Sequence, residues 1–410
     1  MVDIINPQNK KDLLSAVSWA IATQSHMEIV GGGSKATLGR PTQNAAILDM
    51  SAFNSIREYD PTELFIKAGA ATPIADIINT IESENQILAF EPIDFSALLN
   101  LKDKKSTIMG ALSTNFSGPR RIKAGAARDH FLGFEGVSGR AETFKAGGQV
   151  VKNVTGYDLC KLLCGSWGTL GVVDTVSVKV LPAPEKIRTL IIYGLNEEEA
   201  NNCFTSSLNS PNEISGAAWL PSSMSKLSSV EYISTSGSSI TAMRLEGVAT
   251  SVQSRMIDLQ KRLKNCGEMT ELHSSNSCKF WREIRDIIPF TFVSGQVIWR
   301  LSIPPNYGGK VANRIKGEFE SIVFMDWGGA SLWVQLQMSS HNALDLSSKI
   351  HNIARLAGGH ATCIRAPASI RNLIDVFPTL NKAEYNLTRR IKEGFDPKGI
   401  FNFGRMYAEF

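Results

Sequence analysis

Glycine is concentrated in one part of this chain, between Met109 and Pro184. Because glycine has no Cβ atom, it accepts left-handed backbone angles and lets the main chain pass close to another group, so this density indicates tight turns around a closely approached partner. The glycines of this stretch are Gly110, Gly118, Gly125, Gly133, Gly136, Gly139, Gly147, Gly148, Gly156, Gly165, Gly168 and Gly171. The stretch ends in an apolar strand over 172–181 and in Pro182-Ala183-Pro184, which we interpret as a domain boundary.

The size and charge of the chain limit its class. Its 410 residues favour two lobes over a single core, and 43% hydrophobic with 20% charged residues is the balance of a folded globular protein. A formal net charge of +4 is too small for this length to indicate binding to nucleic acid or to a membrane surface. No signal peptide and no long apolar run is found, so we expect a cytoplasmic protein that reaches the inner membrane only through a partner.

The six cysteines do not form a metal-binding pattern. No CxxC occurs, and the nearest pair, Cys160 and Cys164, has the i, i+4 spacing of two residues on one helical face. Two small core residues are the favoured interpretation of this pair. We therefore expect no metal site and no iron–sulfur cluster built by this chain alone.

Helical and strand patterns occur on both sides of the boundary. Before it, an amphipathic helix over 8–24 and a helix that starts at Thr72-Pro73 accompany several short strands. These strands are expected at 27–30, 46–49, 55–59 and 64–68, with a hairpin at 131–137 and 141–145. After the boundary, the expected strands are 188–193, 239–245, 296–302 and 331–337, with helices at 252–263 and 344–356. The fold class predicted is α+β, with a mainly antiparallel sheet in the second domain.

The first candidate binding motif is Val30-Gly31-Gly32-Gly33-Ser34-Lys35, which directly follows a predicted strand. Three glycines let their N–H groups form a concave nest around a phosphate, and Ser34 and Lys35 add a hydroxyl donor and a cation. A simple turn is the alternative. The spacing does not match a P-loop, and a Rossmann site is disfavoured because Thr37-Leu38-Gly39-Arg40-Pro41 cannot continue the helix that such a motif opens.

A second candidate segment runs from Thr107 to Asp129. Small and hydroxyl residues alternate with glycine there, which allows close approach to a pyrophosphate or to the edge of an isoalloxazine ring, and the arginines would offset negative charge. A basic surface loop is the alternative. The candidate residues are Gly110, Ser113, Asn115, Gly118, Arg120, Gly125, Arg128 and Asp129.

A third candidate segment runs from Gly147 to Val173. Asp158 is placed to cap a short helix, and the glycine series that closes the segment would pass the backbone beneath a planar ligand. The candidate residues are Asn153, Tyr157, Asp158, Gly168, Thr169, Gly171 and Val172.

Together these motifs resemble the vanillyl-alcohol-oxidase-type, or PCMH-type, FAD-binding fold, and within it the FAD-binding E subunits of bacterial glycolate oxidase. The motifs that carry the resemblance extend from one end of the chain to the other. They are Gly31–Lys35, Phe90-Glu91-Pro92, Ser117–Arg121, Gly148–Leu162, Ser166–Val172, Gly358–Thr362, Arg365–Pro367 and Phe395–Met406.

The resemblance implies a PCMH-type FAD-binding domain of two subdomains in residues 1–184, a cap domain in residues 185–385, and a tail, residues 386–410, that returns to the first domain. It adds Pro92 and Asn402 to the candidate cofactor-binding residues. Because the loop after Gly33 has no histidine or cysteine that could attach a flavin, the FAD is expected to be non-covalent.

Catalytic D-lactate and glycolate dehydrogenases of this superfamily carry a His-x-Gly-Asp-Gly-Asn-x-His motif in the cap, and none of the six histidines here lies in such a setting. We therefore assign no catalytic residue. The resemblance implies a FAD-binding subunit of a complex that oxidises glycolate to glyoxylate. The complex would also contain a related catalytic flavoprotein and an iron–sulfur subunit, and the flavin of this chain would either relay electrons or have a supporting, structural role. The alternatives are a stand-alone FAD-dependent 2-hydroxy acid dehydrogenase and a flavin-free scaffold.

Overall fold

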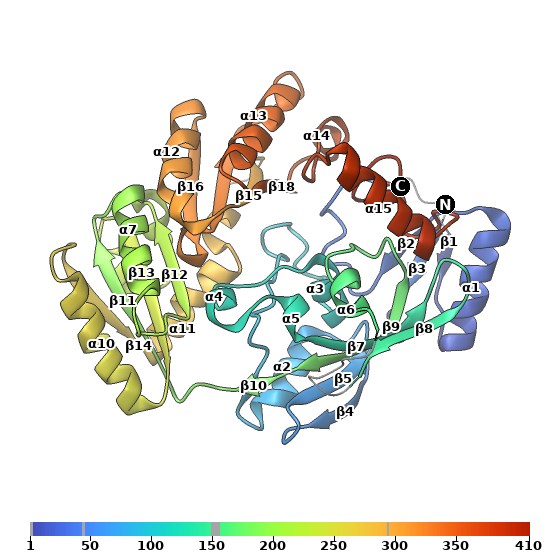
Figure 1. Cartoon of the computed structure of the whole chain (residues 1–410), viewed down its shortest axis with the longest axis horizontal. Coiled ribbons are helices and arrows are strands. Elements are labelled where there is room, and N and C mark those ends of the chain that lie inside the picture. The colour runs from blue at the N-terminus through green and yellow to red at the C-terminus, as the bar shows by residue number, and fades with distance from the viewer. Residues whose placement is uncertain (1–2, 43–45, 149–155, 293–294) are drawn as a thin grey trace. The chain divides into compact units, whose positions relative to one another are not determined.

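A computed structural model describes residues 3–42, 46–148, 156–292 and 295–410. Its contacts divide the chain into two compact units (Figure 1). Unit 1 comprises Met1–Ser117, Gly125–Ala183 and Thr379–Phe410, and unit 2 comprises Gly118–Ala124 and Pro184–Pro378. Both units combine helices with sheets, which confirms the α+β class predicted from the sequence.

Unit 1 opens with a small parallel sheet in the strand order β1-β3-β2. Its strands are β1 (Asp3–Ile5), β2 (Met27–Val30) and β3 (Ala46–Asp49). Helix α1 (Lys10–Thr23) begins at Asn9, whose side chain accepts hydrogen bonds from two N–H groups of the first turn. The apolar face of α1 packs in one core with β2, β3 and, from near the other end of the chain, Ile400 and Phe401.

A second, antiparallel sheet of unit 1 has the strand order β4-β5-β9-β7-β8. Its strands are β4 (Ile56–Asp60), β5 (Phe65–Gly69), β7 (Phe131–Val137), β8 (Thr143–Gly147) and β9 (Val172–Lys179). Strand β9 is the central strand, and all its residues except the last, Lys179, are buried. The predicted hairpin is present as β7 and β8. The short strands β6 (Gln86–Ile87) and β10 (Leu181–Pro182) pair separately.

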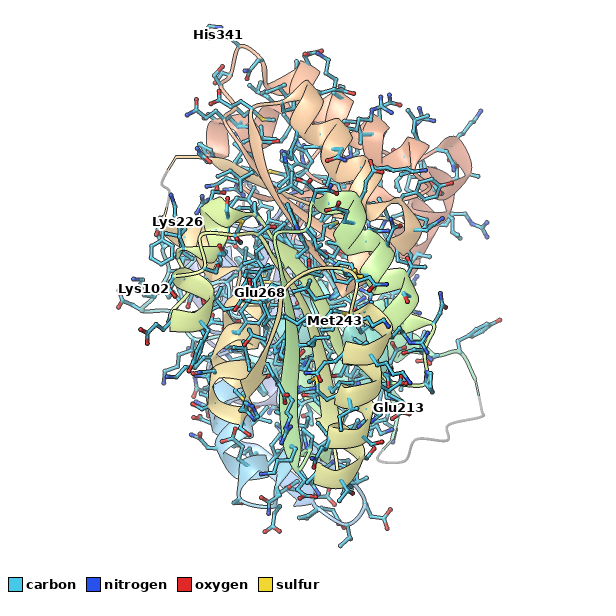
Figure 2. All side chains as sticks on the ribbon, turned by 90° about the vertical axis from the view of Figure 1, so that its left-hand side faces the viewer. Lys102, Glu213, Lys226, Met243, Glu268 and His341 are labelled. Atoms are coloured by element: carbon cyan, nitrogen blue, oxygen red, sulfur yellow. The ribbon has the colours of Figure 1, made fainter. Side chains whose placement is uncertain are left out.

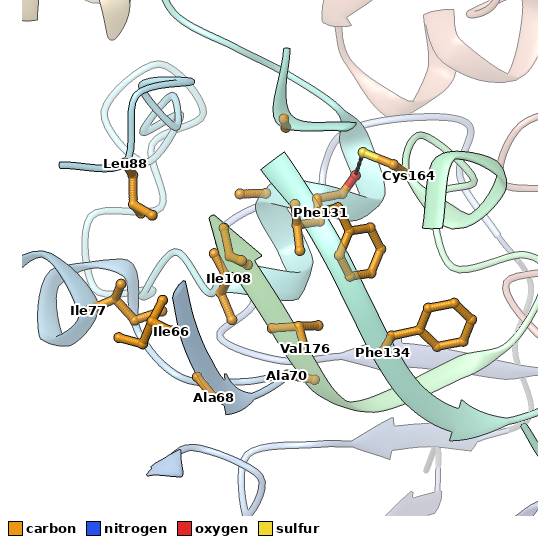
Figure 3. Packing of buried hydrophobic residues seen from close by; sticks show 14 of the residues in the cluster. Ile66, Ala68, Ala70, Ile77, Leu88, Ile108, Phe131, Phe134, Cys164 and Val176 are labelled. Atoms are coloured by element: carbon orange, nitrogen blue, oxygen red, sulfur yellow. Dashed lines mark hydrogen bonds between the residues drawn. The ribbon is translucent and has the colours of Figure 1, made fainter. Parts of the chain in front are cut away.

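Helices cover this second sheet and close its core. They are α2 (Ile74–Glu82), α3 (Ile108–Thr114), α5 (Ala127–His130), α6 (Leu159–Leu163) and α15 (Lys382–Phe395). Figure 3 shows the core, where Ile77 of α2 and Ile108 of α3 lie with Val176 of β9. Cys164 belongs to the same core and its thiol lies 3.0 Å from the Leu112 carbonyl oxygen (Figure 3), so this cysteine is a packing residue.

Unit 2 is built on an eight-stranded antiparallel sheet, as predicted, in the order β14-β11-β13-β12-β16-β17-β15-β18. Its strands are β11 (Lys186–Tyr193), β12 (Gly216–Leu220), β13 (Ile240–Gly247), β14 (Met269–His273), β15 (Val297–Ser302), β16 (Ser321–Asp326), β17 (Ser331–Leu336) and β18 (His360–Arg365).

The helices of unit 2 lie on both faces of this sheet. The α-helices are α4 (Arg121–Ala124), α7 (Glu197–Leu208), α8 (Ser222–Ser225), α9 (Glu231–Ser234), α10 (Ala249–Leu263), α11 (Ser274–Arg285), α12 (Gly308–Glu318), α13 (Ala343–Leu356) and α14 (Ala368–Leu373). Short 3₁₀ helices are η1 (Ile288–Phe292), η2 (Pro305–Tyr307) and η3 (Trp327–Gly329). Met243, labelled in Figure 2, lies on β13. It accepts a hydrogen bond from Ser207 of α7, while the next residue, Arg244, stacks on Trp281 of α11.

Candidate functional site

A cleft that opens to solvent lies within unit 1. Six parts of the chain line it: the end of β2 with its glycine loop, Met50 after β3, Ala70 and Ala71 after β5, helix α3 with Thr107, the loop before β9 with Val173, and the segment 402–405. Apolar side chains line it together with a few polar groups, the lysine and the glycine loop, which is the usual lining of a site for a small molecule. We therefore take this cleft as the candidate site.

The glycine loop packs closely on a neighbouring segment, and at Gly32 no side chain would fit. A Cβ atom on Gly32 would lie 2.0 Å from the Lys105 carbonyl oxygen, and Gly33 has a φ of +74°. Within the described residues, the N–H groups of Gly31 and Gly32 donate no hydrogen bond to protein. These donors fit the predicted nest for an anion.

Lys35 brings a cation to the same loop. Its ammonium donates hydrogen bonds to the hydroxyl oxygens of Ser106 (2.9 Å) and Ser34 (3.4 Å), and in the described part of the chain no carboxylate lies within ion-pair distance of it. Burial lowers the pKa of Lys35 to about 8, against a weaker opposing effect of Asp94. Because a cation withdrawn from water is costly without a counter-charge, this group favours a bound anion.

Asn402 and Arg405 connect the walls of the cleft. The Asn402 side chain accepts a hydrogen bond from the Ile29 N–H (2.9 Å) and donates one to the Trp167 carbonyl oxygen (2.7 Å). Arg405 pairs with Glu28 (3.0 Å) and donates to the Lys35 carbonyl oxygen (2.9 Å). The segment 402–405 therefore fixes both the glycine loop and the loop before β9.

About half of the residues predicted to bind the cofactor line this cleft. They are Val30, Gly31, Gly32, Gly33, Ser34, Lys35, Gly110, Ser113, Gly168, Gly171 and Asn402. The other predicted residues in the described part of the chain are not among the lining residues: Pro92, Asn115, Gly118, Arg120, Gly125, Arg128, Asp129, Tyr157, Asp158, Thr169 and Val172. Asn153 lies outside the described residues.

Several of these other residues have local structural contacts. The Asp129 side chain accepts the Ala126 N–H (2.9 Å) at the start of α5, and Asp158 accepts the Lys161 N–H (3.2 Å) at the start of α6, the cap that the sequence predicted. Tyr157 is 92% exposed. The described contacts of the two aspartates are those of helix caps.

Arg120 has its partner in unit 2. Its guanidinium binds both carboxylate oxygens of Glu246, at 2.7 and 3.0 Å. Burial alone would raise the pKa of Glu246, but the charges of Arg244 and Arg120 outweigh it and lower the pKa to about 2. Arg120, together with Gly118, therefore belongs to unit 2 and anchors the segment 118–124 there.

Other lining residues were not among the predicted ones. They are Glu28, Ile29, Ala36, Met50, Ala70, Ala71, Thr107, Met109, Thr114, Trp167, Val173 and Arg405. Trp167 and Arg405 belong to motifs that carry the family resemblance. These motifs could therefore have indicated that both residues line the site. The apolar lining residues have no pattern that distinguishes them from core residues.

Membrane-spanning helices and clusters of metal ligands are both absent from the described residues. No helix among them has both the length and the apolar character that crossing a bilayer requires. No group of three or more histidine, cysteine, aspartate or glutamate side chains in these ranges is arranged to hold a metal ion.

Comparison with known proteins identifies the family. A family model described as FAD binding domain matches residues 3–147. The chain is 32% identical over 398 residues to glycolate oxidase subunit GlcE of Escherichia coli (strain K12), and the match covers 97% of each chain. It is 33% identical over 200 residues to glycolate oxidase subunit GlcD of Bacillus subtilis (strain 168), which covers 48% of this chain and 40% of that protein.

Among solved structures, p-cresol methylhydroxylase shares the fold with a TM-score of 0.74 at 12% identity, over 99% of this chain and 88% of that chain. The PCMH-type fold predicted from the motifs is therefore present, and FAD is the cofactor that goes with it. The full-length match is the evidence for the narrower family. This chain belongs to the family of glycolate oxidase E subunits, which are FAD-dependent oxidoreductases.

Proposed function

We propose that this chain holds FAD non-covalently in the cleft of unit 1 and acts as a subunit of a glycolate-oxidising complex. The complex also contains a related catalytic flavoprotein and an iron–sulfur subunit. The flavin of this chain either relays electrons in the complex or has a structural role. The relatives named as subunits of glycolate oxidase support a multi-subunit assembly.

The observation that carries the proposal is that the half-buried Lys35, whose ammonium has only hydroxyl partners in the described residues, and the N–H groups of Gly31 and Gly32 belong to one loop that lines the cleft. These groups would hold the pyrophosphate of FAD, because its negative charge offsets the charge of Lys35. Apolar residues that include Met50, Met109 and Val173 line the same cleft and would cover less polar parts of the cofactor. Bound FAD supplies the electron-transfer chemistry that side chains lack.

The residues that line the cleft support the proposal that this chain needs a catalytic partner subunit. Oxidation of glycolate to glyoxylate removes two electrons and two protons, so a base must accept the hydroxyl proton. Among the described lining residues, the one carboxylate is Glu28, which is paired with Arg405, and none is a histidine or cysteine. The same lining offers no side chain of the types expected to attach a flavin covalently.

The proposal is tested with the full chain purified alone. We expect flavin absorption bands, and we expect denaturation to release the flavin into the supernatant. Lys35→Met should lose most of the flavin, whereas Lys104→Met should keep it, since Lys104 is an exposed lysine whose side chain lies beside Gly33. Absence of flavin after incubation with excess FAD, or equal flavin in both variants, would contradict the cofactor site.

Anaerobic glycolate addition then tests the place of this chain in the reaction. We expect no bleaching of the flavin in the isolated chain, and bleaching once the partner subunits are added if its flavin relays electrons. If the flavin of this chain has only a structural role, it would stay oxidised in the assembled complex while the flavin of the catalytic partner subunit is reduced. Bleaching in the isolated chain would show a stand-alone dehydrogenase.

A further inference from the structure

Trp167, beside the cleft of unit 1, has a backbone conformation that is unfavourable for a bulky residue. Its φ angle is +56°, in the left-handed region that glycine and asparagine enter more readily. Gly165 and Gly168 have φ angles of +86° and +72°, so Trp167 is the one non-glycine residue with a positive φ between 165 and 168. Residues that are held in such strained conformations cluster at functional sites.

Hydrogen bonds hold the main chain of Trp167 in this conformation. Its N–H donates to the Ser113 carbonyl oxygen (2.9 Å), and its carbonyl oxygen accepts a hydrogen bond from the Asn402 side chain (2.7 Å). The indole packs edge-on against the ring of Phe116, with the ring centres 5.9 Å apart. Contacts with the segment 113–116 and with Asn402 therefore fix the position of this residue.

Trp167 is the one aromatic residue among the described residues that line the cleft. It is half-buried, so part of the residue remains exposed. The large apolar side chains of the same lining are aliphatic or thioether groups, namely Ile29, Val30, Met50, Met109 and Val173. In the described part of the chain, this indole is therefore the flat π surface that the cleft offers to a ligand.

Helix α3 relates Trp167 to the proposed phosphate site. The ammonium of Lys35 lies 3.9 Å from the position that a Cβ atom of Gly110 would take, at the start of α3. Ser113, which binds the Trp167 N–H, comes three residues later on the same helix, a rise of about 4.5 Å. One FAD molecule with its pyrophosphate at Lys35 is long enough to reach Trp167.

We propose that the indole of Trp167 packs against an aromatic ring of FAD bound in the cleft. This inference rests on the proposed FAD site and adds a residue to it that orients the cofactor. Both rings of FAD, adenine and isoalloxazine, have the π face on which an aromatic side chain stacks. Such contacts between aromatic rings stabilise binding beyond the burial of their area.

The test compares Trp167→Leu with Trp19→Leu in the full chain. Trp19 is the other tryptophan of unit 1, lies on α1 and is not among the residues that line the cleft. Trp167→Leu should weaken FAD binding by about fivefold to a hundredfold, the range for one ring stacked on an aromatic side chain. Trp19→Leu should bind FAD as the parent does, and Trp167→Phe, which keeps a smaller ring, should give an intermediate affinity.

Two further measurements identify the ring. An indole in contact with isoalloxazine quenches the fluorescence of the flavin, so Trp167→Leu should then raise the emission of each bound FAD. ADP has the adenine and the pyrophosphate without the flavin ring, so its affinity should fall in Trp167→Leu if the indole contacts adenine. Isoalloxazine contact therefore predicts higher emission with unchanged ADP binding, and adenine contact predicts weaker ADP binding with unchanged emission.

Parent-like FAD affinity together with parent-like emission in Trp167→Leu would overturn the inference and leave the FAD site in place. An equal loss of affinity in Trp19→Leu would also overturn it. A parent chain that binds no FAD would overturn the FAD site and this inference with it. If Trp167→Leu does not fold, Trp167→Gly replaces it, because glycine removes the ring and accepts a φ of +56° without strain.

Discussion

The ammonium group of Lys392 lies 2.7 Å from the carboxylate of Asp396, and both side chains are almost completely buried. Lys392 also donates to the carbonyl oxygens of Thr169 (2.7 Å) and Phe401 (3.0 Å), while Asp396 accepts the Phe401 N–H (2.9 Å). One ion pair on α15 therefore fastens two segments whose neighbouring residues line the cleft of unit 1.

Lys392→Met should destabilise the protein by about 3 to 5 kcal/mol, because it leaves the Asp396 carboxylate buried without its counter-charge. Urea unfolding measures this change, and the flavin content of the purified variant should fall as the cleft walls separate. Arg389→Gln is the control, since Arg389 and Glu393 form an exposed pair on the same helix and its loss should cost less than about 1 kcal/mol. Equal unfolding midpoints for the two variants would argue against the role of the buried pair.

FAD affinity should depend on pH through Lys35. In the flavin-free protein this group, with its pKa of about 8, loses its proton as the pH rises through that value. Affinity should therefore be level below pH 8 and fall by up to about tenfold per pH unit above it. The flavin-free protein should gain stability between the lowered pKa and the ordinary value of 10.5, because there the unfolded chain binds more protons.

Flavin fluorescence titrations at a series of pH values measure the FAD dependence, and unfolding midpoints over the same range measure stability. Lys35→Met should bind FAD more weakly and show neither trend. A pH-dependent affinity that persists in this variant would assign the titration to another group.

Asn402→Ala should weaken FAD binding by about 1 to 3 kcal/mol, since the Ile29 N–H and the Trp167 carbonyl oxygen both lose their partner. Asn402→Asp keeps the acceptor for the Ile29 N–H and loses the donor to the Trp167 carbonyl oxygen. It should therefore weaken FAD binding less than Asn402→Ala does. Equilibrium dialysis of FAD measures the affinity, and far-UV circular dichroism checks the fold. Parent-like affinity in the alanine variant would show that the cleft walls do not need this bridge.

Gly32→Ala should destabilise the glycine loop, because the new methyl group would meet the Lys105 carbonyl oxygen at 2.0 Å. Gly317→Ala is the comparison, because Gly317 lies in α12 with no atom within 4 Å of its Cβ position. This second change should be neutral or stabilise by up to about 1 kcal/mol. Thermal unfolding and flavin content of both variants provide the measurement, and equal losses would refute the steric argument.

Arg120→Gln should destabilise unit 2 and leave FAD bound, in contrast to the sequence-based assignment of Arg120 to the cofactor. The pKa of Glu246 is lowered to about 2 from 4.5, so its contribution to stability is present above pH 4.5 and is lost as the pH falls through about 2. Acid unfolding followed by tryptophan fluorescence should begin at higher pH in the variant. Loss of flavin with an unchanged acid transition would restore the cofactor assignment.

The sequence predicted those features that depend on short-range rules. The strand that ends at Val30 and the glycine loop after it, the β7–β8 hairpin and the Asp158 cap each need only a few neighbouring residues. The packing of the glycine loop on Lys105 could not be predicted, because no sequence pattern indicates that these two segments lie side by side.

The remaining site residues depend on contacts between distant parts of the chain. Arg405 and Glu28 are 377 residues apart in sequence, and no local pattern indicates that they pair. Asp129 is a different case, because a polar residue among glycines fits a ligand-binding loop and a helix cap equally well, and its described contact is with the Ala126 N–H at the start of α5. The glycine-rich character of 107–121 also concealed helix α3, whose cap is Thr107.

The hydrogen bond between Ile29 and Asn402 joins residues separated by 373 positions. During synthesis, β2 and its glycine loop leave the ribosome early, whereas Asn402 follows only after all of unit 2 has been made. Until then the cleft lacks one wall, and Lys35 lacks the contact that Arg405 makes with its backbone. We therefore expect flavin insertion to follow the synthesis of residue 402, and we expect chains truncated before this residue to be flavin-free.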